Sequence, residues 1–445
     1  MSRYQAYPEY KTVEIDYIDQ IPSDWEEASI SKLFEIKAGG DLKAEYFSEV
    51  QSESHPYPIY TNANDDKSIY GYTSKYFFNA HSITVSGRGE VGFAAFRDHP
   101  FDAIIRLLVL SPLNDCSCKF FAYFINAVID FKVQSSAIGQ LSTQQIAPYK
   151  VVFPQASIQK KIANFLDHET TKIDTLIEKQ QQLIKLLKEK RQAVISHAVT
   201  KGLNPNAPMR DSGVEWLGEV PEGWEVTRVG WMCEFISYGF TNPMPSTSEG
   251  PYMLTATDIE FGRIKYEEAR CTSQEAFNTL LSPKSKPEKG DVLLTKDGTL
   301  GRVVVFHGEY EACISQSVAL LRLDKMKVLP EFLSIAFMGA DYQSKMIFDA
   351  GGTTIKHIYI SILAKMNFIL PSLEEQKKIL EVLSIKLGKM DALIEQADKV
   401  SSLLTERRSA LISAAVTGKI DVRDWQPPEG AATNYSSDSL QEATS

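Results

Sequence analysis

Apolar side chains recur every seven residues along two long segments of this chain. The first segment has two such seams, formed by Leu166, Ile173, Gln180, Leu187 and Val194, and by Thr170, Ile177, Ile184, Arg191 and Ala198. The same pattern returns 217 residues later, with seams formed by Leu383, Met390, Ala397, Leu404 and Leu411, and by Leu387, Ile394, Ser401, Arg408 and Ala415. Sustained seven-residue spacing is typical of coiled coils, so we predict two long helices that pair antiparallel.

Two arginines interrupt these seams at equivalent places. Arg191 and Arg408 each stand where an apolar side chain is expected. A charged residue in a seam can fix the register of the two helices, or it can extend its apolar stem along the rod and leave its charge in water. Both interpretations remain open from the sequence.

The pattern outside these segments is shorter and mixed. Apolar and β-branched runs at residues 57–61, 104–110, 291–294 and 302–306 predict strands, and runs at residues 118–131 and 330–346 predict helices. The fold class we expect is α+β. It consists of two globular α/β domains separated by two long antiparallel coiled-coil helices, in a pseudo-two-fold internal repeat.

The repeat is visible in the residues themselves. Ile21-Pro22-x-x-Trp25-Glu26 returns as Val220-Pro221-x-x-Trp224-Glu225, a separation of 199 residues, and Pro154…Gln159-Lys160-Lys161-Ile162 returns as Pro371…Gln376-Lys377-Lys378-Ile379. We therefore divide the chain into a first domain at 1–153, a central helix and spacer at 154–203, a second domain at 204–370, a distal helix at 371–420 and a mobile tail at 421–445. A doubled chain suits a two-fold partner, and duplex DNA is a common one.

Net charge limits how such a partner can be held. The chain carries a formal net charge of −10, and of the segments we counted only residues 151–203 are positive, at +4. We therefore expect any DNA contact to use local basic groups, with partner subunits supplying much of the attraction to phosphates.

The five cysteines form no zinc-binding pattern. We find no apolar run of membrane-spanning length and no signal peptide, so we expect a cytoplasmic protein with no membrane partner.

A glycine-rich motif needs separate treatment. Gly87-Arg88-Gly89-Glu90-Val91-Gly92 has the spacing of a dinucleotide-binding loop, but that loop must be followed by a helix, and a strand is predicted here. The second half has Lys296-Asp297-Gly298-Thr299-Leu300-Gly301 at the same place. We interpret the shared glycines as those of hairpin turns. Arg88 at one tip and Lys296 and Thr299 at the other are candidates for DNA contact, although a solvated turn charge is the competing interpretation.

A second pair of loops also occupies matching places. Gln140, Ser142 and Thr143 precede one strand, and Thr353, Thr354 and Lys356 precede its counterpart. Such side chains hydrogen-bond to base edges and phosphates. The alternative is that each loop caps a following short helix. The two loops carry different side chains at matching positions, which favours two domains that each recognise a different DNA sequence.

Recognised catalytic patterns are missing from the sequence. We find no phosphate-binding loop, no nucleophile elbow and no His-Glu-x-x-His zinc motif. His55, His81, His99 and His357 are interpreted as surface or packing residues. An enzymatic function is therefore not expected for this chain.

With these motifs in view, the chain resembles the specificity subunit of type I restriction-modification systems over nearly its full length. The resemblance implies that two target-recognition domains each read one half of a split, asymmetric DNA site, with the helices setting the spacer. It also implies that the helix starts, through Gln159, Lys160, Ile162, Gln376, Lys377 and Ile379, contribute to subunit interfaces.

The partners implied by the resemblance are double-stranded DNA, two modification subunits and restriction subunits. S-adenosylmethionine, ATP and Mg are then cofactors of those subunits, and this chain itself needs none. The competing class of function is a non-catalytic protein-interaction scaffold without DNA reading, which the acidic charge favours.

Overall fold

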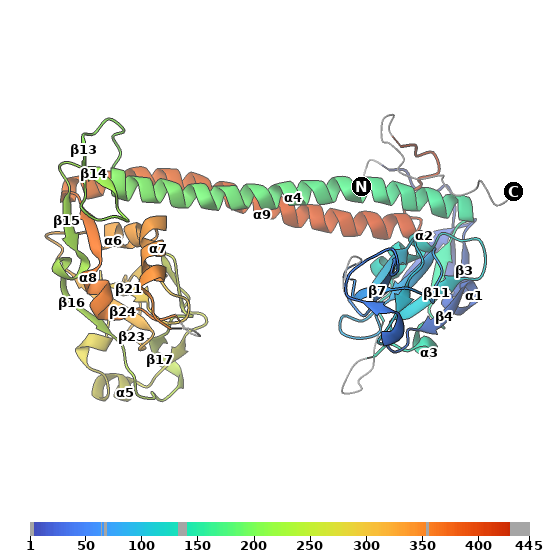
Figure 1. Cartoon of the computed structure of the whole chain (residues 1–445), viewed down its shortest axis with the longest axis horizontal. Helices are drawn as coiled ribbons and strands as arrows, with labels where there is room; N and C mark the ends of the chain where they lie inside the picture. Colours follow the sequence, from blue (N-terminus) through green and yellow to red (C-terminus); the bar gives the residue numbers. More distant parts are fainter. Residues whose placement is uncertain (1–3, 64, 66–68, 132–139, 353–355, 428–445) are drawn as a thin grey trace. The chain divides into compact units, whose positions relative to one another are not determined.

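A computed structural model describes residues 4–63, 65, 69–131, 140–352 and 356–427 (Figure 1). The chain separates into two compact units. Unit 1 comprises Met1–Gln180 and Lys399–Ser445, and unit 2 comprises Gln181–Asp398. Each unit contains one mixed α/β domain, called domain 1 in unit 1 and domain 2 in unit 2, together with part of each long helix. The two domains are thus linked by helices, as the repeat predicts.

Domain 1 is built from two four-stranded sheets and two strand pairs. The first sheet has the order β4 (Phe34–Ala38), β11 (Leu108–Pro112), β8 (Ser82–Val85), β9 (Ala94–Arg97), and the second has the order β10 (Asp102–Ala103), β6 (Tyr57–Tyr60), β7 (Gly71–Thr73), β5 (Phe47–Ser48). The strand pairs are β1 (Tyr10–Ile15) with β2 (Ile18–Pro22), and β3 (Glu26–Ser29) with β12 (Lys150–Phe153). The helices are α1 (Ile30–Leu33), α2 (Cys118–Val128) and α3 (Thr143–Ile146).

Domain 2 has a closely similar sheet topology. One sheet has the order β16 (Cys233–Tyr238), β24 (Val318–Leu323), β21 (Val292–Thr295), β22 (Val303–Val305), and another has the order β20 (Arg270–Cys271), β17 (Thr247–Leu254), β23 (Ala312–Ile314). The strand pairs are β13 (Met209–Asp211) with β14 (Glu219–Pro221), β15 (Glu225–Arg228) with β25 (Asn367–Leu370), and β18 (Ile259–Glu260) with β19 (Arg263–Ile264). Its helices are α5 (Gln274–Thr279), α6 (Pro330–Phe337), α7 (Ala340–Asp349) and α8 (Ile360–Lys365).

The register of the strands repeats as well as their order. Phe153 pairs with Glu26 in domain 1, and Leu370 pairs with Glu225 in domain 2. Both domains also contain a parallel strand pair, β6 with β10 and β17 with β23, whereas the other strand pairs among the described residues are antiparallel. The sequence repeat is therefore a repeat of tertiary structure.

The long helices are α4 (Ala156–Lys201) and α9 (Leu373–Val416). Every predicted seam residue is buried or half-buried, whereas most residues between the seams are exposed. In unit 1 the first part of α4 and the last part of α9 join one core, and in unit 2 the last part of α4 and the first part of α9 join another. The two helices are thus antiparallel in each unit, as predicted.

The two seam arginines form equivalent ion pairs between the helices. In unit 1, Arg408 Nε lies 2.8 Å from Asp174 Oδ1, and in unit 2, Arg191 Nε lies 3.0 Å from Asp391 Oδ1. The same helix-to-helix pair therefore occurs once in each unit. This geometry favours a role in fixing the register over an arginine that only extends into water.

Three predicted elements differ from the structure. The strand expected at residues 104–110 begins only at Leu108, because Ile105 and Arg106 adopt left-handed backbone conformations and bond to the two glycines at residues 39–40. The helix expected at residues 330–346 is divided into α6 and α7, which begins just after Gly339. The helix expected at residues 118–131 ends at Val128.

The tail expected at residues 421–445 begins with packed residues. Val422 is buried in the core of unit 1, and the ring of Trp425 meets the ring of Phe165 edge-on at 5.6 Å. The backbone N–H of Asp421 donates to the carbonyl of Gln5 at 2.7 Å. This first part of the segment therefore belongs to unit 1, and residues 428–445 lie outside the described residues.

No helix in the described ranges is both long and apolar enough to cross a membrane.

Candidate nucleic-acid interface

Each domain presents one hairpin turn with the same internal bonding. The turn at residues 86–93, called turn 1, joins β8 to β9, and the turn at residues 295–302, called turn 2, joins β21 to β22. Phe93 N–H donates to Ser86 Oγ at 2.9 Å, and Arg302 N–H donates to Thr295 Oγ1 at 2.9 Å. In each turn the hydroxyl of the first residue therefore accepts a hydrogen bond from the backbone N–H of the last residue, although the residues between them differ.

Glycines supply the backbone conformation that both turns require. Gly89 and Gly298 each have φ of 72°, and Gly92 and Gly301 have φ of 95° and 85°. Such positive values strain residues that carry a Cβ atom. The structure confirms the interpretation of these residues as hairpin glycines, because a strand and not a helix follows each turn.

The second predicted loop of each domain lies against the turn. Leu141 N–H donates to the Gly87 carbonyl at 2.8 Å in domain 1, and Ile358 N–H donates to the Lys296 carbonyl at 3.0 Å in domain 2. The loops that sequence analysis selected separately are therefore brought together at one place in each domain.

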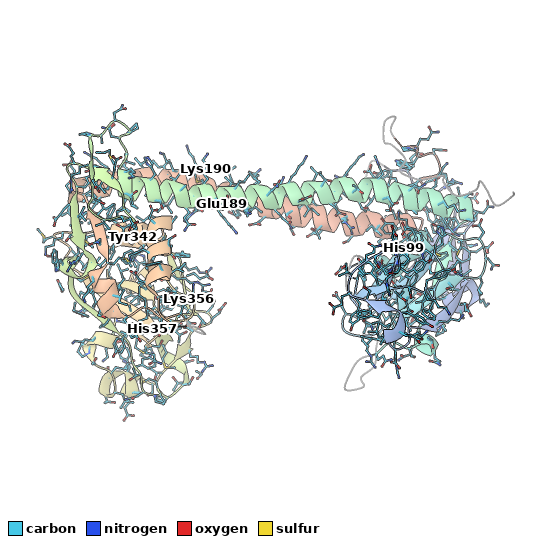
Figure 2. All side chains as sticks on the ribbon, in the orientation of Figure 1. His99, Glu189, Lys190, Tyr342, Lys356 and His357 are labelled. Atoms are coloured by element: carbon cyan, nitrogen blue, oxygen red, sulfur yellow. The ribbon has the colours of Figure 1, made fainter. Side chains whose placement is uncertain are left out.

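A side-chain pair joins turn and loop in both domains. In domain 1, Arg88 Nη2 donates to Gln140 Oε1 at 3.1 Å. In domain 2, Asp297 Oδ1 and His357 Nδ1 are in direct hydrogen-bond contact. Figure 2 labels His357 beside Lys356 on domain 2. The half-buried ring of His357 packs against Tyr359, as a surface or packing residue would, and it also bonds to Asp297 of the turn.

Lys296 does not occupy the position that the sequence suggested. Its side chain is only 7% exposed, and its Nζ lies 3.1 Å from Asp297 Oδ2. Aligning the glycines of the two turns pairs Arg88 with Asp297, and Gly87 with Lys296. Lys296 is therefore a buried counter-ion beneath turn 2. The exposed Lys356 remains available, and its carbonyl accepts from Gly298 N–H at 3.3 Å.

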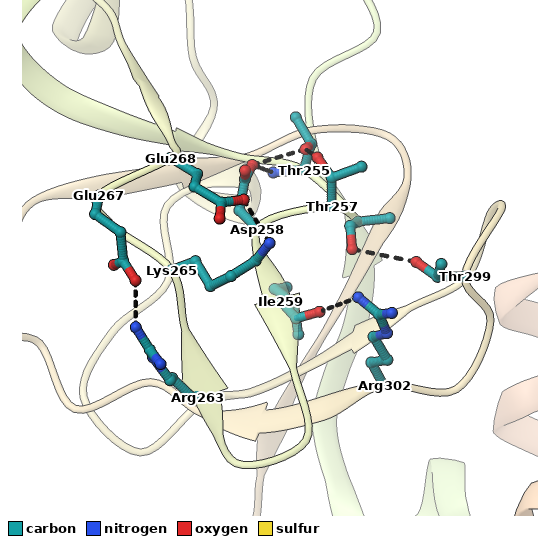
Figure 3. Close-up of polar contacts among 11 residues, drawn as sticks. Thr255, Thr257, Asp258, Ile259, Arg263, Lys265, Glu267, Glu268, Thr299 and Arg302 are labelled. Atoms are coloured by element: carbon teal, nitrogen blue, oxygen red, sulfur yellow. Dashed lines mark hydrogen bonds and ion pairs between the residues drawn. The ribbon is translucent and has the colours of Figure 1, made fainter. Parts of the chain in front are cut away.

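A third loop, which sequence analysis missed, completes the cluster in each domain. In domain 1, Asn62 Oδ1 accepts from Gly87 N–H at 2.6 Å and from Arg88 N–H at 3.1 Å. In domain 2, Thr299 Oγ1 donates to the Ala256 carbonyl at 3.3 Å, as Figure 3 shows beside Thr255 and Thr257. Both loops directly follow equivalent strands, β6 and β17. The repeat offers a signal for them, but only once those two strands have been aligned.

Domain 2 also has a hollow beside this third loop. Its volume is about 560 Å³, and it is lined mainly by polar groups with some apolar side chains, including Thr255, Thr257, Asp258, Arg270, Ser315 and Met253. Asp258 Oδ2 accepts from Thr255 N–H at 2.7 Å, which fixes the loop that forms its wall.

The remaining predicted contact residues divide into two groups. Ser142 caps α3, since its side chain accepts from Gln145 N–H in a capping box, and Thr143 begins that helix. The alternative interpretation of this loop as a helix cap therefore holds for Ser142. Thr353 and Thr354 lie outside the described residues.

Four of the six residues predicted at subunit interfaces are buried in their own unit. Ile162 and Ile379 have no exposed surface, and Gln159 and Gln376 are 3% and 0% exposed. Gln159 Oε1 accepts from Ser117 N–H, and Gln376 Oε1 accepts from Leu329 N–H, both at 2.9 Å. These side chains anchor each long helix to its own domain. Only Lys160 and Lys377 are exposed and available to a partner.

The cluster can form hydrogen bonds with a ligand. Among the described ranges, no group of three or more His, Cys, Asp or Glu side chains could hold a metal ion. The tips instead offer guanidinium, amide, carboxylate and imidazole groups on rigid turns. Such groups suit the recognition of a polar surface such as base edges.

The chain thus has two similar α/β domains with polar hairpin tips, linked by two antiparallel helices. The model of the type I restriction modification DNA specificity domain matches residues 22–186 and 221–399, which is more than half of the chain. The chain therefore belongs to this family.

Individual relatives agree with this assignment. The chain is 23% identical over 307 residues to the type I restriction enzyme EcoBI specificity subunit of Escherichia coli, covering 67% of this chain and 64% of that relative. It is 33% identical over 156 residues to the putative type I specificity subunit S.MpnORF89P of Mycoplasma pneumoniae, covering 34% of this chain and 46% of that relative. The alignments thus span less than two thirds of these relatives.

Solved structures show the same fold. A chain from a study of complex assembly and conformational transition of the type I R-M system matches with a TM-score of 0.68 at 14% identity, covering 90% of this chain and 99% of that chain. The HsdS subunit from Thermoanaerobacter tengcongensis matches with a TM-score of 0.50 at 14% identity, covering 90% and 98%.

Proposed function

We propose that this chain is the sequence-specific DNA-recognition subunit of a type I restriction-modification complex, and that each domain reads one half of a bipartite, asymmetric site. One observation carries the proposal. In both domains two loops meet one hairpin turn, and the second loop bonds to the turn backbone in the same way in both, while the side chains at the tip differ. A reader of an asymmetric site needs this combination of equal scaffolds and unequal contacts.

The chain acts without catalysis in this proposal and depends on partner subunits. Two modification subunits, which carry S-adenosylmethionine, dock along the helices, and restriction subunits that use ATP and Mg join them. Exposed apolar side chains support docking on the helices, namely Leu176 and Leu403 in unit 1 and Leu183, Leu186, Ile385 and Leu393 in unit 2. The exposed Lys160 and Lys377 adjoin the helix starts. The assembled complex works in the cytoplasm on double-stranded DNA.

An exchange of domains tests the proposal. Residues 17–153 are replaced by the equivalent block of another family member, and the methylated sites of the complete complex are mapped on genomic DNA. We expect one half of the site to change and the other half to stay. A change in both halves contradicts the two-reader arrangement, and methylation that follows no bipartite site supports the scaffold alternative. A gel shift with and without modification subunits separates DNA reading from scaffolding directly.

The helices set the spacing between the two half-sites in this proposal. A helix rises about 1.5 Å per residue, so four residues inserted after Gln180 add roughly 6 Å and nearly keep the seam. DNA rises about 3.4 Å per base pair, so the spacer should lengthen by one or two base pairs while the half-sites stay the same. One inserted residue rotates the seam by about 100° and should abolish methylation. An unchanged spacer in the four-residue variant contradicts the proposal.

A further inference from the structure

The two hairpin tips carry equivalent pairs of side chains with opposite hydrogen-bonding character. Arg88 and Asp297 both precede the glycine at φ 72°, and each contacts the loop residue just before the one that bonds to the turn backbone. Those loop residues are Gln140 and His357. One position thus holds a hydrogen-bond donor in domain 1 and an acceptor in domain 2.

In domain 1 the pair leaves one edge of a guanidinium for a ligand. Arg88 Nη2 uses one N–H on Gln140 Oε1, and Arg88 Nε is buried. A base contact then falls to the N–H groups that remain on Nη1 and Nη2. Two of these N–H groups match guanine O6 and N7 in the major groove, which is a common specific contact of arginine with DNA. Gln140 acts as a positioning residue, because it holds the guanidinium plane.

In domain 2 the pair presents acceptors. Asp297 receives Lys296 Nζ at 3.1 Å and contacts His357 Nδ1, so the proton of the neutral ring belongs on Nδ1. A base contact by His357 therefore falls to the lone pair of Nε2, next to the Asp297 carboxylate. The edge of the ring of His357 also packs on Tyr359 at 4.5 Å, which limits its rotation. Acceptors of this kind match an exocyclic amino group, on adenine N6 or cytosine N4.

We infer that Arg88 and the Asp297–His357 pair determine specificity at equivalent positions of the two half-sites. Arg88 requires a guanine in the half-site read by domain 1. Asp297 and His357 accept from the major-groove amino group of adenine or cytosine at the equivalent position of the half-site read by domain 2. The inference rests on the proposed DNA-reading function and adds the chemistry of one base position in each half-site.

The test uses the complete complex with its modification subunits and a library of randomised DNA targets, whose methylated members are sequenced. Arg88→Gln should relax the preference for guanine at one position of one half-site, by roughly 10-fold or more, because glutamine matches adenine instead. Asp297→Asn and His357→Phe should each relax one position of the other half-site. The matched controls are Lys37→Gln and Glu267→Gln, which remove one exposed charge of the same sign on the same domain. They should leave both half-sites unchanged.

A second measurement guards against variants that fail to fold. The unmodified complex is titrated with DNA in which each guanine in turn is replaced by 7-deazaguanine, which lacks the N7 acceptor. Binding should weaken by about 10-fold at one guanine of the domain 1 half-site. A domain 1 half-site that has no G·C pair overturns the inference, as do Asp297→Asn and His357→Phe variants that keep every base preference in the domain 2 half-site.

The outcomes separate the inference from the function on which it rests. If the unmodified complex methylates a bipartite site and the tip variants keep every base preference, the tip pairs are not the readers but DNA reading stands. If the unmodified complex methylates without any bipartite site, the proposed function itself fails.

Discussion

The start of the long helix is held more tightly in unit 2 than in unit 1. Gln376 bonds to Leu329 N–H, to the Lys327 carbonyl and to the Pro371 carbonyl, each at 2.9 Å. Gln159 makes two of these three bonds, to Ser117 N–H at 2.9 Å and to the Pro154 carbonyl at 2.8 Å. The same residue type at the same helix position thus makes three hydrogen bonds in unit 2 and two in unit 1.

The tryptophans that precede these helices differ in the same direction. Trp224 Nε1 donates to Glu375 Oε2 at 2.9 Å, whereas Trp25 Nε1 is buried and, among the residues that the structure describes, has no partner within hydrogen-bond distance and lies beside Tyr7. Ile158 occupies the position in unit 1 that corresponds to Glu375. In contrast, Lys11 and Arg210 both donate to the backbone carbonyl of the nearby tryptophan. Repeats can therefore keep a backbone bond through a change of residue and still lose a side-chain bond at the next helix.

The largest expected difference comes from removing the two glutamines. Gln376→Ala leaves buried backbone groups unpaired and should lower the free energy of unfolding by about 3 kcal/mol, and Gln159→Ala by about 2 kcal/mol. Scanning calorimetry of the two variants measures the difference. Lys377→Ala and Lys160→Ala, at the neighbouring exposed positions, should each stay within about 0.5 kcal/mol. Equal losses in the free energy of unfolding for Gln376→Ala and Gln159→Ala would contradict the tighter attachment of the helix in unit 2.

A smaller effect is expected at the tryptophan anchor. Glu375→Ile gives unit 2 the residue that unit 1 already has, so Trp224 Nε1 should lose its acceptor at a cost of about 1 kcal/mol. Glu375→Gln keeps an acceptor oxygen and should retain most of the stability. Denaturant unfolding followed by tryptophan fluorescence tests both variants. If Glu375→Ile is as stable as Glu375→Gln, the hydrogen bond between Trp224 and Glu375 does not stabilise unit 2.

Alkaline pH should distinguish the units through Tyr7. Burial first, and then the charge of Asp421, raises the pKa of Tyr7 to about 12. The unfolded chain releases this proton near pH 10 and the folded chain only near 12, so the contribution of Tyr7 to stability is present below pH 10 and is lost as the pH rises to 12. Asn206 stands at the corresponding place in unit 2 and cannot contribute. Tyr7→Phe should make the melting temperature of unit 1 fall less steeply between pH 10 and 12 and leave it unchanged at pH 7, with Tyr17, whose pKa burial also raises to about 12, keeping part of the slope. A slope equal to that of the unmodified protein contradicts this.

The smallest effect should come from the ion pairs between the helices. Arg408–Asp174 and Arg191–Asp391 are partly exposed, so each should contribute about 0.5 kcal/mol or less and weaken in salt. Double-mutant cycles with alanine at both members measure each pair. We expect equal coupling in the two units. A coupling well above 1 kcal/mol in one unit only would show that the helices are not equivalent there.

Periodic and local features of this protein could be predicted from the sequence. The seams of α4 and α9 follow from seven-residue spacing, and every residue of these seams is buried or half-buried. The hairpin turns follow from their glycines, which need no tertiary context. The left-handed residues Ile105 and Arg106 could not be foreseen, because their backbone is held by Gly39 and Gly40 from a distant part of the chain.

The position of the site in each domain could be predicted from the sequence, but the side-chain contacts within it could not. The turns and Gln140 are predictable from the sequence, but the tip cations Arg88 and Lys296 do not correspond, because the aligned glycines pair Arg88 with Asp297. The contact of His357 is not predictable, because a lone histidine gives no sign of its partner across 60 residues. The expectation that Gln159 and Gln376 lie at interfaces fails because polar residues at a helix start can equally bond to their own domain.

The division of unit 1 between the two ends of the chain fixes the order in which the protein can be completed during synthesis. All of unit 2, Gln181–Asp398, has been translated before Lys399 is added. Ile412, Ala415 and Val416 of α9 belong to the core of unit 1, and the Gly418 carbonyl accepts from Tyr10 Oη–H at 3.0 Å. On the ribosome domain 1 is therefore synthesised first, but its core is completed last. Its apolar face stays uncovered until the final residues of α9 have been translated.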